Sequence, residues 1–271
     1  MTQGAPPFYL PIGSECELFN AAFAQRLAVM LKGPTGCGKT RFVEAMAHEV
    51  GRPLITVACH DDLSAADLVG RHLLEGGETV WVDGPLTRAV KTGAVCYLDE
   101  VVEARQDTTV VLHPLADHRR QLPLERLGIT LKAAEGFCLV VSYNPGYQSV
   151  LKDLKDSTRQ RMLAIELDFP PPDAEIEIVT REAGVDHRLA ADLVHLGQAI
   201  RRLESRTLRE VASTRTLIAA ALIVAHGVTL RDAARSAIAG PLTDDPALRD
   251  GLFQVIDAYL PPSNPNDGGT S

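Results

Sequence analysis

Residues 33 to 40 read Gly33-Pro34-Thr35-Gly36-Cys37-Gly38-Lys39-Thr40, which fits the pattern Gly-x-x-x-x-Gly-Lys-Thr of a phosphate-binding loop. Glycines allow left-handed backbone conformations and let backbone N–H groups approach a phosphate closely. We expect all eight residues to bind ATP or ADP, with Lys39 reaching the β- and γ-phosphates and Thr40 binding Mg²⁺. The loop therefore predicts a protein that binds and hydrolyses ATP.

The segments on both sides of this loop follow the order that a phosphate-binding loop requires. Leu27–Leu31 is a short apolar run that predicts a buried strand ending at the loop. Arg41–Val50 repeats its apolar residues at helical spacing, so we expect a helix whose N-terminus faces the phosphates. Strand, loop and helix together favour a working loop over a chance match.

Four further apolar runs alternate with helix-like segments. The five predicted strands are Leu27–Leu31, Leu54–Cys59, Ala94–Leu98, Phe137–Ser142 and Ile165–Phe169. Runs that are apolar on both faces are typical of parallel strands covered by helices. We expect an α/β fold of the P-loop NTPase class, with a parallel five-stranded sheet and helices on both faces.

Two stretches break this alternation and predict inserted hairpins. In Leu73–Leu86, the residues Glu75-Gly76-Gly77-Glu78 are a turn signal between two strand-like segments. In Arg120–Lys132, strand-like residues stand on both sides of Glu125–Gly128. A plain strand-helix-strand unit needs neither.

A separate helical region is expected after Pro170-Pro171-Pro172, because three prolines cannot continue a helix. The helically periodic segments beyond them are Asp173–Ala183, Leu189–Leu203, Thr214–His226 and Leu230–Ile238. We expect an α/β nucleotide-binding domain at 1–170, an all-helical lid subdomain at 171–260 and a flexible tail at 261–271.

Two adjacent carboxylates follow the predicted strand Ala94–Leu98. Ligands of α/β sheets bind at the carboxyl ends of the strands, where Asp99 and Glu100 would lie. We expect Asp99 to bind Mg²⁺ through its waters and Glu100 to act as the base that polarises the attacking water. The alternative is two acids that begin an exposed loop.

Asn144 follows the predicted strand Phe137–Ser142 and would lie at the same sheet edge as Asp99. An amide there could align a water with the γ-phosphate. Turn formation by Tyr143-Asn144-Pro145-Gly146 is the alternative.

The composition excludes several classes of function. Of 271 residues, 27 are basic and 35 acidic, which gives a net charge of −8 and makes nucleic acid a poor partner. The five cysteines form no Cys-x-x-Cys pair, which argues against structural zinc and disulfides. No stretch approaches the roughly 18 apolar residues of a membrane span. We expect a cytoplasmic protein without a membrane partner.

The motifs together resemble the AAA+ ATPases of the MoxR branch, and within it the CbbQ/NirQ/NorQ family. The matching segments are Leu27–Val43, Val95–Glu100, Val141–Gly146 and Ser157–Met162, and the likeness extends over residues 5 to 260. The resemblance implies Walker A at Gly33–Thr40, Walker B at Asp99 and Glu100, and sensor 1 at Asn144.

The resemblance also implies roles for three arginines. Arg159 or Arg161, just ahead of the fifth strand, would be the finger that reaches the nucleotide of a neighbouring subunit, and the sequence does not choose between them. Arg215 would be the sensor 2 arginine of the same subunit, although Thr214 stands where many relatives have Pro. Solvated surface arginines are the alternative for all three.

The hairpins are similar to the helix 2 and pre-sensor 1 inserts, which face the pore of a ring in this family. Trp81, the chain's one Trp, is either a pore-loop anchor or a packing residue. The resemblance implies a homo-oligomer in the form of a hexameric ring.

The resemblance implies a remodelling motor, or chaperone, that activates a metabolic enzyme. CbbQ members act on inhibited Rubisco and NirQ/NorQ members on nitric-oxide reductase or related enzymes, each with a partner bearing a von Willebrand factor A (VWA) domain. We favour Rubisco activation with a CbbO-like VWA adaptor. The alternatives are NirQ/NorQ-type activation of nitric-oxide or nitrite reductase, a nucleotide-gated binding module without mechanical work, and a P-loop kinase of a small molecule.

Overall fold

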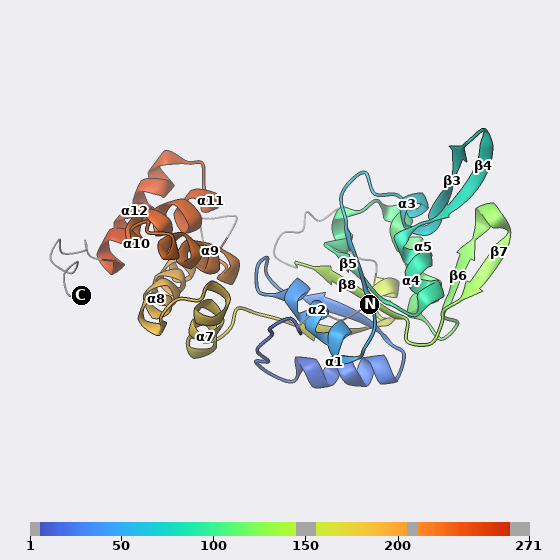
Figure 1. Ribbon diagram of the computed structural model, residues 1–271, viewed down its shortest axis with the longest axis horizontal. Helices are drawn as coiled ribbons and strands as arrows, with labels where there is room; N and C mark the ends of the chain where they lie inside the picture. The colour runs from blue at the N-terminus through green and yellow to red at the C-terminus, as the bar shows by residue number, and fades with distance from the viewer. Residues whose placement is uncertain (1–5, 145–155, 205–210, 261–271) are drawn as a thin grey trace. The chain divides into compact units, whose positions relative to one another are not determined.

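The computed structural model describes residues 6–144, 156–204 and 211–260. The chain divides into two compact units, the first made of residues 1–34 and 39–167 and the second of 35–38 and 168–271. The first unit contains the strands and the second is helical (Figure 1). The tail expected at 261–271 lies outside the described residues.

Five parallel strands form the main sheet, in the spatial order β2-β5-β8-β1-β9. They are β1 (Ala28–Lys32), β2 (Leu54–Ala58), β5 (Val95–Asp99), β8 (Cys138–Tyr143) and β9 (Met162–Glu166). The three inner strands are almost wholly buried, whereas β2 and β9 at the edges are partly exposed. The parallel five-stranded sheet expected from the apolar runs is confirmed.

The fifth strand differs in position from its prediction at Ile165–Phe169. It begins at Met162, where its register pairs Met162 with Ala28 and Glu166 with Lys32 of β1. An edge strand exposes part of its length, so its apolar residues do not form the continuous run that marks an inner strand. Asp168 lies beyond the strand, where its carboxylate accepts a hydrogen bond from the backbone N–H of Phe169.

Helices cover both faces of the sheet, as expected (Figure 1). Successive strand residues point to opposite faces, so Val95 and Tyr97 pack with α1 (Glu15–Ala24) and α2 (Lys39–Glu49). Cys96 and Leu98 belong to the other core. The helices that contribute to this second core are α3 (Ala65–Val69), α4 (Pro85–Thr92) and α5 (Gln106–Ala116).

Both predicted hairpins are present. The first pairs β3 (Gly70–Glu75) with β4 (Glu78–Asp83), and Gly76 and Gly77 turn the chain with φ of 60° and 88°. Those angles lie in the left-handed region that glycine adopts without strain. The second pairs β6 (Gln121–Leu124) with β7 (Ile129–Lys132).

The second unit is all-helical in its described part, which confirms the helical C-terminal region. Its elements are α7 (Pro172–Ala183), α8 (His187–Glu204), α9 (Thr214–Ala225), α10 (Leu230–Ala234), a π-helical turn η3 (Arg235–Ala239), α11 (Gly240–Leu242) and α12 (Pro246–Tyr259). Sequence reasoning missed α12. Its start was readable, because Asp245 caps the helix and Pro246 occupies its first turn.

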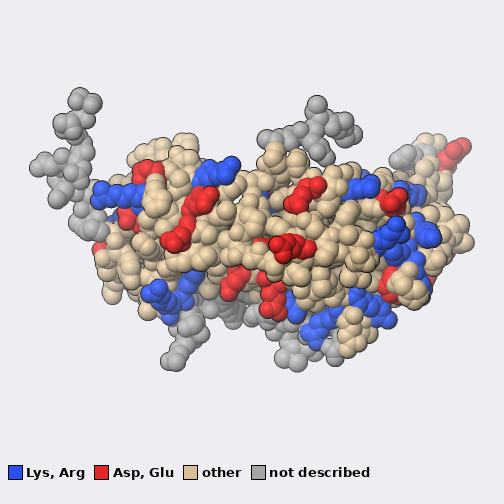
Figure 2. Space-filling view, turned by 90° about the horizontal axis from the view of Figure 1, so that it is seen from below, with Lys and Arg blue, Asp and Glu red and all other residues tan. Residues whose placement is uncertain are grey.

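No helix among the described residues is long and apolar enough to cross a membrane. Figure 2 shows Lys and Arg side chains interspersed with Asp and Glu over the face seen there. Charges of both signs therefore share that face.

Candidate nucleotide-binding site

The phosphate-binding loop joins the end of β1 to the start of α2. Gly36 and Gly38 adopt φ of 77° and 100°, and a Cβ at Gly38 would meet no atom within 4 Å. Lys39 is buried, and its ammonium group donates to the carbonyls of Gly33 and Pro34, at 2.8 and 2.9 Å. The loop thus holds a positive charge beside open space at Gly38, which fits a phosphate group.

The carboxylate of Asp99, at the end of β5, is held by two buried hydroxyls. Its Oδ1 accepts from the Tyr97 hydroxyl at 2.7 Å and from Ser142 Oγ at 2.6 Å. The Tyr97 hydroxyl also hydrogen-bonds to the side chain of Thr40 at the start of α2. Thr40 and Asp99, both predicted to bind Mg²⁺, are therefore linked through a single phenol.

Burial, and then the negative charge of Asp99, raise the pKa of Tyr97 well above its usual range. The phenol consequently stays protonated and can donate to the carboxylate. Sequence reasoning missed both Tyr97 and Ser142. The available signal was a polar side chain near the carboxyl end of two otherwise apolar strands.

Glu100 occupies a strained position immediately after the strand. Its φ of 55° and ψ of 47° place a residue other than glycine in the left-handed region, which costs roughly 1–3 kcal/mol. Its backbone N–H donates to Ser142 Oγ at 3.1 Å, and its side chain is exposed. Ser142 therefore holds the backbone of Glu100 as well as the carboxylate of Asp99.

The thiol of Cys59 lies close enough to Asp99 and Glu100 for their negative charges to affect its pKa. Cys59 lies just past β2, where its backbone N–H donates to the carbonyl of Asp99 at 2.9 Å. Burial, followed by the negative charges of Asp99 and Glu100, raises the pKa of Cys59 to about 12. A negative potential of this kind favours a bound cation.

Asn144 lies between the two motifs. It follows β8, which the sheet order places between β5 and β1, and the N–H of Gly33 donates to the carbonyl of the preceding Tyr143 at 3.4 Å. The asparagine is thus beside both the start of the loop and the strand of Asp99. Pro145 and Gly146 lie outside the described residues.

The two finger candidates directly precede β9. Arg159 ends the short helix α6 (Asp156–Arg159), Arg161 follows it, and both are half-buried. The Arg161 guanidinium donates to the carbonyl of Ser157, while the buried hydroxyl of Thr158 lies 2.5 Å from Nε2 of His113 on α5. These contacts anchor residues 157–161, and they do not distinguish Arg159 from Arg161 as the finger.

Arg215 belongs to the second unit. It is the second residue of α9 and is exposed. The helix is capped by Ser213, whose hydroxyl accepts from the N–H of Thr216. The contact of Arg215 with a nucleotide stays a prediction.

Mg²⁺ suits the donors at the sheet edge. No group of three or more His, Cys, Asp or Glu side chains able to hold a metal occurs in the parts of the chain that are described. Mg²⁺ commonly keeps several waters and takes only one or two protein ligands together with substrate phosphates. The Thr40 hydroxyl and the Asp99 carboxylate meet that requirement.

Two family models match the chain. A model of the AAA domain (dynein-related subfamily) matches residues 28–162, and a model of the CbbQ/NirQ/NorQ C-terminal region matches residues 175–259. Together they cover four of the five strands of the main sheet, both hairpins and most of the helical unit.

Three curated relatives match over almost their whole length. The chain is 60% identical over 257 residues to the denitrification regulatory protein NirQ of Stutzerimonas stutzeri, and 61% over 254 residues to the protein NorQ of Paracoccus denitrificans, each match covering 94% of both chains. It is 55% identical over 246 residues to the protein CbbQ of Hydrogenophilus thermoluteolus, covering 91% of this chain and 92% of that one.

A solved structure has the same fold. A protein from Cytophaga hutchinsonii superposes with a TM-score of 0.51 at 17% identity, covering 93% of this chain and 90% of the other.

Proposed function

Because the chain belongs to the CbbQ/NirQ/NorQ family of AAA+ ATPases, we propose that it uses ATP hydrolysis to remodel and activate a client enzyme. The observation that best supports the hydrolytic part is the hydrogen-bonded series Thr40, Tyr97, Asp99 and Ser142, which joins the phosphate-binding loop to the carboxylates at the end of β5. The activating part rests on the family.

Each site residue of the first unit has a defined task in this proposal. The Lys39 ammonium binds the β- and γ-phosphates, and Thr40 and Asp99 would hold Mg²⁺, which would supply positive charge against the phosphate oxygens. Glu100 accepts a proton from the attacking water, and the amide of Asn144 orients that water. Ser142 keeps Asp99 and Glu100 in their relative positions.

The arginines would complete the site. Arg159 or Arg161 stabilises the charge on a neighbouring subunit's nucleotide, and Arg215 contacts the γ-phosphate within its own subunit. This assignment requires a homo-oligomer, and we propose a hexameric ring. It also predicts slow hydrolysis by the monomer.

Two clients are in competition. The overall similarity to the family favours Rubisco, as for CbbQ members, with a CbbO-like VWA adaptor. The identities of 60% and 61% to NirQ and NorQ, against 55% to CbbQ, support a denitrification enzyme such as nitric-oxide or nitrite reductase at least as well. We therefore propose a metabolic client with a VWA-domain adaptor and retain both identities for testing.

The variant Glu100→Gln tests whether hydrolysis drives activation. We expect it to retain ATP binding, because the loop is intact, and to lose turnover and client activation together. Activation by this variant would refute the motor and leave a nucleotide-gated binding module. Glu103→Gln, a change of the same kind in the 3₁₀ turn Val101–Glu103, is the matched control and should keep both activities.

Alanine substitution of Arg159 and of Arg161 tests the shared site. We expect one of the two variants to bind ATP normally and to lose the hydrolysis that depends on oligomer formation. Undiminished turnover in both, at every protein concentration, would instead favour a small-molecule kinase with a site complete in one subunit.

A direct comparison of clients tests the last part. The chain and its VWA partner are assayed for ATPase activity with inhibited Rubisco and, separately, with inactive nitric-oxide or nitrite reductase. The true client should stimulate hydrolysis and regain activity in an ATP-dependent way. Stimulation by none of them would refute both client identities.

A further inference from the structure

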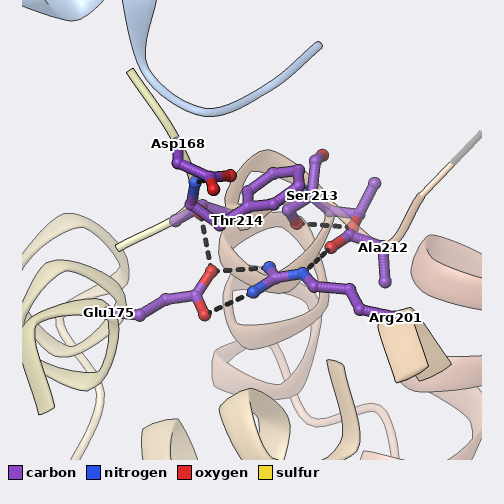
Figure 3. Close-up of polar contacts among 8 residues, drawn as sticks. Asp168, Glu175, Arg201, Ala212, Ser213 and Thr214 are labelled. Carbon is purple, nitrogen blue, oxygen red and sulfur yellow. Dashed lines mark hydrogen bonds and ion pairs between the residues drawn. The ribbon is translucent and has the colours of Figure 1, made fainter. Parts of the chain in front are cut away.

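A buried ion pair joins two helices of the second unit (Figure 3). Glu175 of α7 is fully buried, and both its carboxylate oxygens accept hydrogen bonds from the guanidinium of Arg201 on α8, at 2.7 and 2.8 Å. The side chain of Arg201 is only 14% exposed. The two charges thus form a forked, largely dehydrated pair.

Both members of this pair also bind the start of α9. Arg201 Nε donates to the carbonyl of Ala212 at 2.5 Å, and the hydroxyl of Thr214 donates to Glu175 Oε1 at 2.6 Å (Figure 3). The guanidinium further lies 4.2 Å from the ring centre of Phe169, next to the point where the chain enters the second unit. Three helices and the entering chain therefore meet at one ion pair.

Stability alone does not account for such an arrangement. Removing two charges from water costs about as much as their attraction returns, so apolar residues of similar volume often serve equally well. A forked pair does fix direction, because the planar guanidinium accepts only a narrow range of positions for its partners. The groups held here, the carbonyl of Ala212 and the hydroxyl of Thr214, lie on either side of the capping residue Ser213.

We propose that Glu175 and Arg201 are positioning residues for Arg215, acting through the hydrogen bonds to Ala212 and Thr214 that fix the first turn of α9. Arg215 directly follows Thr214, so a rotation of that turn redirects its side chain. This inference rests on the proposed contact of Arg215 with the γ-phosphate.

A double-mutant cycle between Thr214→Val and Arg215→Ala tests the proposal in the full-length chain. Valine keeps the shape of threonine and removes only the hydroxyl that binds Glu175. With Arg215 present, we expect Thr214→Val to raise the KM for ATP on the order of fivefold, the size of a modest coupling between sites. In the Arg215→Ala background, Thr214→Val should raise it no further. Arg201→Lys keeps the charge but loses the fork and should behave in the same way.

Asp257→Asn is the matched control, because it breaks another ion pair of the same unit, the one between Asp257 and Arg235. Like Arg201, Arg235 also stacks on an aromatic ring, that of Phe253. It should alter the melting temperature while leaving the KM for ATP unchanged.

Equal effects of Thr214→Val in both backgrounds would overturn the positioning role, because the hydroxyl would then act on the fold alone. An Arg215→Ala variant with unchanged ATP kinetics would remove the proposed role of Arg215 itself, and the inference with it. The two failures are distinguishable because the second needs only the single variant.

Discussion

Ser142 is the residue on which the geometry of the sheet edge depends most. It is fully buried, donates to Asp99 Oδ1 at 2.6 Å and accepts from the N–H of Glu100 at 3.1 Å. The substitution Ser142→Ala removes both bonds, together with the 3.1 Å hydrogen bond that Ser142 Oγ accepts from the Tyr97 hydroxyl, and changes the side-chain volume little. Asp99 keeps its bond to the Tyr97 hydroxyl, so the carboxylate is not left without a donor.

The expected cost follows from these contacts. A hydrogen bond to a charged group contributes about 1.5–3 kcal/mol and a neutral one about 0.5–1.5 kcal/mol. Because the Tyr97 hydroxyl still donates to the Asp99 carboxylate, only part of the charged-group contribution is lost. We expect a loss of about 2 kcal/mol in the free energy of unfolding, or roughly 4–8 °C in melting temperature. The left-handed backbone of Glu100 costs roughly 1–3 kcal/mol, and without Ser142 it can relax. A relaxation worth about 1.4 kcal/mol in the transition state lowers kcat about tenfold.

Steady-state ATP hydrolysis and thermal unfolding measure the two effects separately. The matched control is Thr87→Val, because the Thr87 hydroxyl is equally buried and donates to the carbonyl of Val69 at 2.6 Å, in α4 and away from the site. The control should lower the melting temperature and leave kcat unchanged. If Ser142→Ala lowers kcat no more than the control does, the positioning of Glu100 by Ser142 is refuted.

Three further predictions concern other parts of the first unit and the loop. Cys37, half-buried in the loop, should react with a thiol reagent before the three buried thiols, because burial raises the pKa of each of those three to about 12. ATP should slow the reaction of Cys37, which is followed by absorbance. A reaction rate that ATP does not change would count against the loop as the ATP-binding site. Burial alone would raise the pKa of Asp83, but hydrogen bonds from the Lys91 ammonium and the Trp81 indole bring that pKa below its usual range. The ionised carboxylate therefore stabilises the fold above about pH 4, and this stabilisation is lost as the pH falls further. Asp83→Asn should therefore lose about 0.5 kcal/mol at neutral pH, measured by emission of the sole tryptophan during denaturation, and the difference should vanish in acid; a constant difference would contradict this. Gly93→Ala should cost at least about 1 kcal/mol, measured by thermal unfolding, because φ is 68° and a Cβ would lie 2.2 Å from a backbone carbonyl oxygen; unchanged stability would mean that the end of α4 can shift freely.

Local patterns were sufficient wherever one segment determines its own structure. The inner strands are apolar on both faces, so β1, β5 and β8 could be located within one residue, and the turn signals Gly76-Gly77 and Glu125–Gly128 located the hairpins. The edge strand β9 was misplaced by three residues because half its surface faces solvent and its pattern is mixed. A cap signal at Asp245-Pro246 was present in the sequence and went unused.

By itself, the sequence determined the phosphate-binding loop, the parallel sheet, the carboxylates at the end of β5 and the family. The loop, the individual strands and the carboxylates are each predicted from residues that are neighbours in the chain, and the family from these motifs taken together. Only the tertiary structure brought Thr40, Tyr97 and Ser142 together around Asp99, and Glu175 and Arg201 together beneath the start of α9. Strand register and helix packing decide which distant polar side chains meet. A buried polar group is stable only when it finds such a partner, and a linear pattern does not state where that partner lies.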